Sequence, residues 1–153
     1  MAVSTWQLFY GSTYTTHSFN VFIKNLNIDE TITMLEFFEN FRIDFTVTAS
    51  GWTYQVQDGT SPAATFNGPE NYNEQWITIG HSYNDVTKEL IAYINGQSVG
   101  SSSVLDFSFD PQFFSVGPSG VSAGTEWQVD EMAFWKDVIL DPANFEQLAN
   151  MLP

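Results

Sequence analysis

Hydrophobic and polar residues alternate along most of the chain, and turn residues interrupt the alternation at short intervals. The clearest example is the segment 41–48, where every second residue is apolar and the residues between are polar. A period of two is typical of a β-strand with one buried face. The pattern therefore predicts a strand whose core-facing residues are Phe41, Ile43, Phe45 and Val47.

Similar segments predict further strands, separated by turn signals such as Ser50-Gly51, Asp58-Gly59 and Asn95-Gly96. Asn-Gly between two apolar runs is the strongest short hairpin signal. The expected strands span residues 6–10, 19–24, 31–38, 41–48, 52–57, 76–83, 90–94, 113–117 and 127–135. Residues 60–75 are polar and contain prolines, which predicts a long loop of the kind that often serves function. Residues 100–103 are expected to form a flexible connector.

The end of the chain carries the pattern of a short helix. Asp141 is a good N-cap, and Pro142 suits the first helical position. One helical face would then contain Phe145, Leu148, Ala149 and Leu152. Many short strands, one short helix and the absence of a linker predict a single domain over residues 1–153. Its fold class is all-β, a two-sheet antiparallel β-sandwich or jelly roll.

The net charge of the chain limits the kinds of partner that it is expected to bind. The 153 residues include 18 Asp and Glu but only 4 Lys and Arg, for a formal charge of −14. Nucleic acid and anionic membrane surfaces are excluded as expected partners, because both require clustered cations. The chain has no Cys, which removes disulfides and thiolate metal sites. Neither a signal peptide nor a transmembrane segment is recognisable.

Three stretches of the second half, with a short segment between them, resemble the corresponding parts of a known protein superfamily. Residues 76–83 form a strand led by Trp76, and residues 88–99 form a strand pair around Asn95-Gly96. Residues 129–135 contain Asp130-Glu131 and lead through 138–142 to the terminal helix, and 114–117 form a small strand ending in Gly. In this order the segment 76–152 resembles the concanavalin A-like lectin and glucanase superfamily, in its laminin-G-like or pentraxin-like branch. The resemblance implies two curved antiparallel sheets, but not one function, because this fold hosts lectins, adhesion modules, glycosidases and viral structural domains.

Catalytic spacings are not recognisable in the sequence. Glucanases of this superfamily place their carboxylates on one strand face, whereas Glu36 and Glu39, or Asp130 and Glu131, would face opposite sides of a strand. His17 and His81 are separated by no short metal-binding spacing, although folding could bring them together. The expectation is a protein without enzymatic activity and without a cofactor.

Asp130 is the carboxylate of greatest interest, because in a regularly alternating strand it shares a face with Met132 and Phe134. A carboxylate at the edge of the core requires partners. Backbone N–H groups of a crossing loop would make it a structural latch, which is the favoured interpretation. A calcium ion, as in several relatives, is the alternative.

Aromatic residues could also form a sugar-binding platform. Trp52 and Tyr54 share one strand face, and Tyr72 lies in the expected loop beside Asn73. Sugar rings stack on aromatic faces, while amides bind hydroxyl groups. The competing interpretation is a core role, because most of the aromatic residues, which make up 16% of the chain, must be buried.

These observations predict a non-enzymatic binding or assembly protein. Without a secretion signal, a catalytic motif or a second domain, the chain is expected to be a subunit that docks on other proteins. The first hypothesis is a component of a virus or phage particle, as a capsid decoration or tail-associated subunit, located in the virion or another extracellular assembly. The alternative is a glycan-binding, lectin-like module, and a further alternative is a divergent glycosidase.

Overall fold

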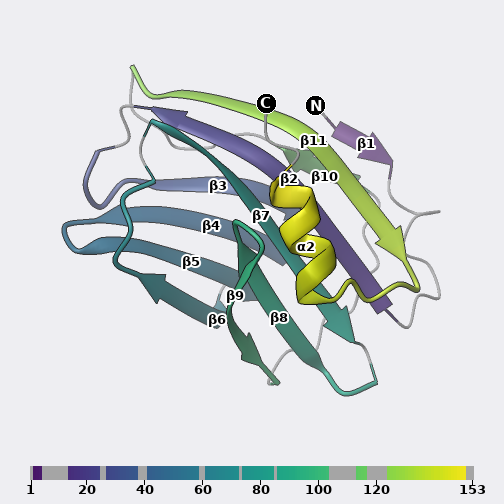
Figure 1. Cartoon of the computed structure of the whole chain (residues 1–153). Helices are drawn as coiled ribbons and strands as arrows, with labels where there is room; N and C mark the ends of the chain where they lie inside the picture. The colour runs from purple at the N-terminus through teal and green to yellow at the C-terminus, as the bar shows by residue number, and fades with distance from the viewer. Residues whose placement is uncertain are drawn as a thin grey trace.

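The computed structural model describes residues 2–4, 14–24, 27–37, 41–58, 61–72, 74–84, 86–103, 113–116 and 124–150. They form two antiparallel sheets that pack face to face, with one helix outside them (Figure 1). This architecture confirms the all-β, two-sheet sandwich with a short C-terminal helix. No helix in these ranges has the length and apolar character needed to cross a membrane.

The two sheets contain strands from all parts of the chain. The six-stranded sheet has the order β1 (Ala2–Ser4), β10 (Phe113–Val116), β3 (Thr31–Phe37), β4 (Phe41–Thr48), β5 (Gly51–Asp58) and β6 (Ser61–Gly68). The five-stranded sheet has the order β11 (Glu126–Lys136), β2 (Tyr14–Lys24), β7 (Gln75–Asn84), β8 (Glu89–Ile94) and β9 (Gln97–Ser102). In Figure 1 the five-stranded sheet and the helix α2 (Pro142–Ala149) lie in front of β3, β4, β5 and β6.

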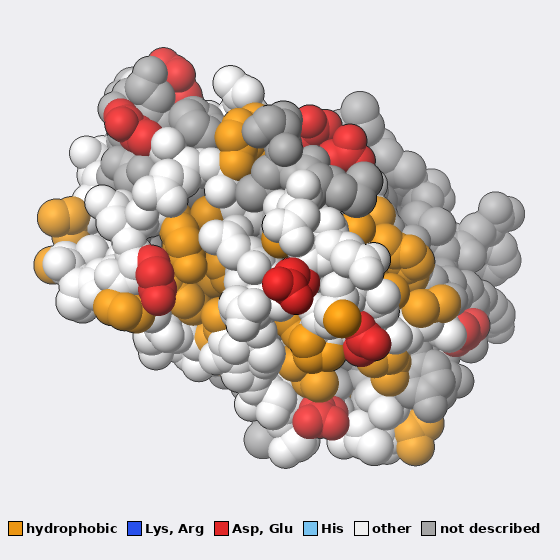
Figure 2. Space-filling view, viewed as in Figure 1, with side chains coloured by type: hydrophobic (Ala, Val, Ile, Leu, Met, Phe, Trp, Pro, Cys, Tyr) orange, Lys and Arg blue, Asp and Glu red, His pale blue; other side chains and the backbone are white. Residues whose placement is uncertain are grey.

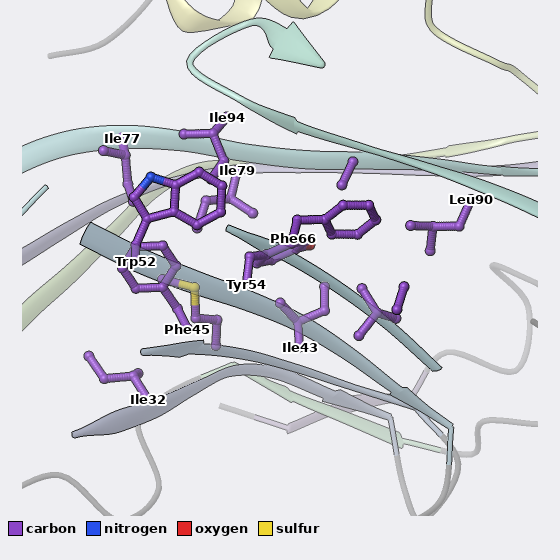
Figure 3. Packing of buried hydrophobic residues seen from close by; sticks show 14 of the residues in the cluster. Ile32, Ile43, Phe45, Trp52, Tyr54, Phe66, Ile77, Ile79, Leu90 and Ile94 are labelled. Atoms are coloured by element: carbon purple, nitrogen blue, oxygen red, sulfur yellow. The ribbon is translucent and has the colours of Figure 1, made fainter. Parts of the chain in front are cut away.

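The core lies between the sheets and follows the predicted alternation. Ile43 and Phe45 are fully buried, and Val47 packs against the buried cluster. The side chain of Phe41 lies outside those described. Figure 3 shows residues of β4, β5 and β6 pointing toward residues of the facing sheet such as Ile77 and Ile79. The register of β4 is therefore the one that the sequence predicts.

The expected long loop over 60–75 is wrong, because residues 61–68 of it form the strand β6. Asp58 pairs with Ser61 across the turn from β5 to β6. Within β6 the buried residues Ala64 and Phe66 alternate with exposed residues, as in any half-buried strand. Pro62 misled the prediction; it is tolerated because β6 lies at the edge of its sheet, where a missing N–H donor costs little. Similarly, β9 includes residues 100–102, which were expected to form a connector.

Most other expected elements agree with the structure to within a residue, although β2 begins at Tyr14 and not at Phe19, and β1 was not expected. The Asn95-Gly96 turn joins β8 to β9, and both residues have positive φ angles of 49° and 79°, as a type I′ turn requires. The side-chain oxygen of Asn95 accepts a hydrogen bond from the Thr78 N–H at 2.9 Å, which ties the turn to β7. The strand expected at 6–10 lies outside the described residues.

The helix α2 begins as predicted, with Asp141 as its N-cap and Pro142 at its start. Phe145 is fully buried, and its ring stacks on Tyr93 with centroids 4.0 Å apart. Because α2 packs on the outer face of the five-stranded sheet, residues 77–83 of β7 are buried on both faces. Leu148 is half-buried, and Leu152 lies outside the described residues.

Candidate functional site

The candidate site lies where the β4–β5 turn meets the end of β6. Trp52 pairs with Gly68 across β5 and β6, next to Gly51 at the start of β5. Gly51 has a φ of 142°, and a Cβ atom there would lie 1.9 Å from the Gly68 carbonyl oxygen. Only glycine permits this approach, which brings the segment after β6 against the turn.

Trp52 is a core residue, with 3% of its surface exposed. Its ring lies 6.1 Å from that of Phe45, at an interplanar angle of 17°, and also 6.1 Å from that of Tyr72, at 32°. Figure 3 shows the indole beside Phe45 and below Ile77 and Ile94. The faces of this ring are therefore not available to a ligand.

The indole N–H of Trp52 instead fixes a surface carboxylate. It donates a hydrogen bond to Oε2 of the exposed Glu70 at 2.9 Å. A Cβ atom on Gly68 would lie 2.5 Å from that oxygen and 2.5 Å from the Trp52 ring, so glycine is needed for the contact. Burial raises the pKa of Tyr72, and the negative charge of Glu70 raises it further.

A pocket of about 390 Å³ lies at this corner; Trp52 and Pro69 line it, whereas Glu70 is not among its lining residues. We call it the corner pocket, and its lining residues are Thr48, Ser50, Trp52, Thr53, Asn67, Gly68 and Pro69. Its volume falls in the range of small-molecule sites. The Thr53 hydroxyl donates to the Asn67 side-chain oxygen at 2.9 Å, and this bond does not use the NH₂ group of Asn67. Hydroxyl and amide groups of this kind recognise polar, uncharged molecules.

The structure separates the residues of the expected sugar platform. The rings of Trp52 and the half-buried Tyr72 are in contact, but of these two residues only Trp52 lines the corner pocket. Tyr54 is fully buried between the sheets, with its hydroxyl 3.4 Å from Nδ1 of His81, so it cannot stack on a sugar at the surface. Asn73 lies outside the described residues. Sequence reasoning missed Asn67 and Glu70, because their place depends on the pairing of β5 with β6.

Asp130 does not have the environment that regular alternation predicts. The register of β11 on β2 shifts between Asp130 and Ala133, and Glu131 has a φ of 49°. This bulge leaves Met132 37% exposed and turns Asp130 to the solvent, so the expected position at the edge of the core is wrong. The carboxylate accepts the N–H of Glu131 at 2.9 Å, within the bulge itself rather than from a crossing loop. Across the described residues, no three His, Asp or Glu side chains gather as a metal site.

The two histidines, far apart in the sequence, lie opposite each other in the five-stranded sheet. His17 of β2 pairs with His81 of β7. His81 is 1% exposed and faces Tyr54 of the other sheet. Burial also raises the pKa of Tyr54. The position of His81 within the core is that of a packing residue.

Comparisons with known proteins bear on the fold. No protein-family model matches the chain, and no curated protein matches it by sequence. Among solved structures, the binding domain of botulinum neurotoxin DC in complex with SialylT has a TM-score of 0.71 at 13% identity, covering 97% of this chain and 38% of that one. A structure of botulinum neurotoxin type C, whose cell entry is dependent upon interaction with two ganglioside molecules, has a TM-score of 0.67 at 13% identity, with 92% and 36% covered.

The native heptameric SAP-like pentraxin from Limulus polyphemus is also similar, with a TM-score of 0.67 at 15% identity, covering 90% of this chain and 70% of the pentraxin. At these identities the likeness shows the fold alone, a two-sheet β-sandwich, and the concanavalin A-like superfamily stays a prediction. The chain spans little more than a third of the neurotoxin chains that it matches. The laminin-G-like or pentraxin-like branch stays a prediction.

Proposed function

We propose that the protein, as a single domain over residues 1–153, is a non-enzymatic binding module that holds a neutral glycan in the corner pocket. The observation that carries the proposal is the lining of this pocket by hydroxyl and amide groups, together with Trp52, a lining residue whose indole fixes the Glu70 carboxylate at 2.9 Å. A carboxylate held in this way accepts strong, charge-assisted hydrogen bonds from sugar hydroxyl groups. Tyr72, half-buried next to Trp52, offers an aromatic surface at the same corner.

The similar structures support the class of ligand. One of them is in complex with SialylT, and another belongs to a toxin whose cell entry depends on ganglioside molecules. Glycan recognition is therefore compatible with this type of sandwich. The likeness is one of fold, so the position of the site rests on the corner pocket of this chain alone.

Charge favours an uncharged glycan over an anionic one. The described lining of the corner pocket includes no Lys or Arg, and one lining residue, Trp52, is hydrogen-bonded to the Glu70 carboxylate. The whole chain has a formal charge of −14. Among the coloured side chains on the face seen in Figure 2, Asp and Glu are visible but Lys and Arg are not. A sialylated or sulfated glycan would therefore meet repulsion without a compensating cation.

The test is a binding assay with neutral and anionic glycans, first on an array and then by titration calorimetry. Glu70→Gln keeps the shape of the side chain but removes its charge, and it should weaken binding of a neutral glycan about tenfold or more. Asn67→Ala should act in the same direction. Glu146→Gln, a charge removal on the exposed side of α2, is the matched control and should leave affinity unchanged. Preference for sialylated glycans, or affinity insensitive to both pocket variants, would exclude this proposal.

The second candidate is a docking subunit of a virus or phage particle. Its support is three exposed apolar side chains that follow β7 and β11. These two strands flank β2 and finish at the same end of the sheet. Val86 is 72% exposed, Val138 41% and Ile139 47%. Exposed apolar groups of this kind are typical of contact surfaces. Co-sedimentation with particles should then depend on these residues, and the double variant Val86→Ser with Ile139→Ser should abolish it without changing glycan binding.

A further inference from the structure

A row of polar residues crosses the six-stranded sheet from β3 to β6. Thr31 pairs with Thr46, Thr46 pairs with Thr53, and Thr53 pairs with Asn67. We call these four residues the cross-strand ladder. With adjacent strands about 4.8 Å apart, the ladder is about 14 Å long.

The cross-strand ladder faces away from the core. Its neighbours along each strand, such as Ile32, Phe45 and Phe66, are buried, and successive side chains of a strand point to opposite faces. Thr31 and Asn67 at the two ends are exposed, and the two threonines between them are half-buried. The outer face of the sheet therefore presents a continuous line of hydroxyl and amide groups to the solvent.

Hydrogen bonds align the groups of the cross-strand ladder in pairs. The Thr31 and Thr46 hydroxyl oxygens are 2.8 Å apart, and Thr53 donates to Asn67 at 2.9 Å. Each hydroxyl group retains further hydrogen-bonding capacity after one such bond, because a hydroxyl oxygen has two lone pairs and one proton. The row can therefore both donate to and accept from a ligand.

The strands that carry the ladder are fixed by a buried polar network in the next row. Asp44, only 2% exposed, accepts hydrogen bonds from Thr33 of β3, Arg42 of β4 and Gln57 of β5. Such a network holds three strands in one register. The spacing of the ladder is thus set before any ligand binds, which lowers the entropy that binding must offset.

The cross-strand ladder is continuous with the corner pocket. Thr53 and Asn67 belong to both, and Thr48, another pocket residue, lies on the same face of β4 as Thr46. A ligand that leaves the pocket along this face meets Thr46 and then Thr31. The pocket alone has room for a small group, whereas pocket and ladder together form an extended track.

We propose that the cross-strand ladder is an extended subsite for an uncharged polysaccharide chain, which lies across the strands with one end in the corner pocket. The inference rests on the proposed glycan function and names its ligand class. The ladder offers neither charge nor aromatic rings, so it pairs with the repeated hydroxyl groups of a neutral polymer. A row with one polar group per strand suits a chain of several sugar units more than an isolated sugar.

The test measures how affinity depends on chain length. A panel of neutral polysaccharides (β-glucan, xylan, mannan and galactan) identifies the polymer that the wild-type protein binds, and its oligosaccharides of two to six units are titrated by calorimetry. For the wild-type protein the affinity should rise about tenfold or more between two and six units. The double variant Thr31→Val with Thr46→Val should weaken binding of six units about tenfold and leave binding of two units unchanged.

Valine preserves the branched shape and strand preference of threonine, so these variants should fold, and circular dichroism verifies this. Thr87→Val, at an exposed position in the β7–β8 turn, is the matched control and should bind both lengths as the wild type does. Equal affinity for two and six units, or loss of both lengths in the Thr31 and Thr46 variant, would overturn the extended subsite. Absence of binding to every neutral polymer, or no effect of Glu70→Gln at any length, would instead overturn the glycan function itself.

Discussion

Replacement of Asp44 by Asn should destabilise the six-stranded sheet. It puts an NH₂ donor where a carboxylate oxygen accepts hydrogen bonds, at a buried position where water cannot supply a replacement acceptor. In the native protein one carboxylate oxygen accepts from Thr33 at 2.8 Å, while the other accepts from Arg42 at 2.9 Å and from Gln57. If the substituted amide keeps its carbonyl oxygen toward Thr33, its NH₂ group faces the donors of Arg42 and Gln57. The substitution thus preserves shape and removes two acceptor contacts.

The magnitude follows from the exposure of each partner. Gln57 is 8% exposed, so its amide donor loses its acceptor without gaining water, which costs about 1–3 kcal/mol. The Arg42 side chain is 40% exposed, so its ion pair with Asp44 is screened, and its loss costs at most about 1 kcal/mol. Together these effects give about 1–4 kcal/mol. With a urea slope of about 2 kcal/mol per molar, the unfolding midpoint should fall by about 0.5–2 M.

Urea unfolding monitored by tryptophan fluorescence measures this change, and a swapped pair provides the control. Gln57→Glu alone places a second carboxylate beside Asp44 and should also destabilise. Combined with Asp44→Asn it restores an acceptor opposite the new NH₂ group and a partner for Arg42, so the double variant should recover much of the loss. Strict additivity of the two single variants, or a cost below about 0.5 kcal/mol for Asp44→Asn, would refute a buried network at this position.

Other predictions concern the helix, the turn and the tyrosines. Gly96→Ala should lower the melting temperature, because its φ is 79° and a Cβ would lie 2.5 Å from the backbone of α2. Asp141→Ala removes the N-cap and should lower the free energy of urea unfolding by about 0.5–2 kcal/mol. Glu70→Gln should lower the pKa of Tyr72, measured by ultraviolet titration, although burial keeps it raised. Burial raises the pKa of Tyr54, so the unfolded state loses that proton first; the free energy of unfolding should fall as the pH rises above about 10, and less so in Tyr54→Phe.

The sequence alone predicts the structure correctly wherever an element depends on local periodicity. The alternation around Ile43 and Phe45 predicts which face of β4 is buried, because a strand with one buried face has no other register. Asp141 followed by Pro142 predicts the start of α2, because the cap satisfies donors within the same turn. These features need no knowledge of distant segments.

The predictions from sequence were wrong where a structural feature depends on how one strand pairs with another. β6 lies at an edge, so its polar outer face and Pro62 resemble a loop when read alone. The bulge at Asp130 inserts an extra residue into the alternation, and no local signal in 126–136 marks where it occurs. Both errors also affected the sites. Tyr72 does lie between strands, but in the short connection from β6 to β7 and not in a long loop over 60–75. The second error placed Asp130 at the edge of the core.

The hydrogen bond from Trp52 to Glu70 shows how a buried aromatic residue can orient a surface group. Trp52 is buried against Phe45, yet its N–H orients a surface carboxylate that is 18 residues further along the chain. The position of Glu70 is therefore determined by core packing. A core substitution such as Phe45→Leu, which contacts no ligand, should shift the indole and weaken glycan binding together with stability, whereas a substitution in the core beneath α2 should affect stability alone. The glycan affinity of this sandwich would then depend on the packing of its core as well as on its surface residues.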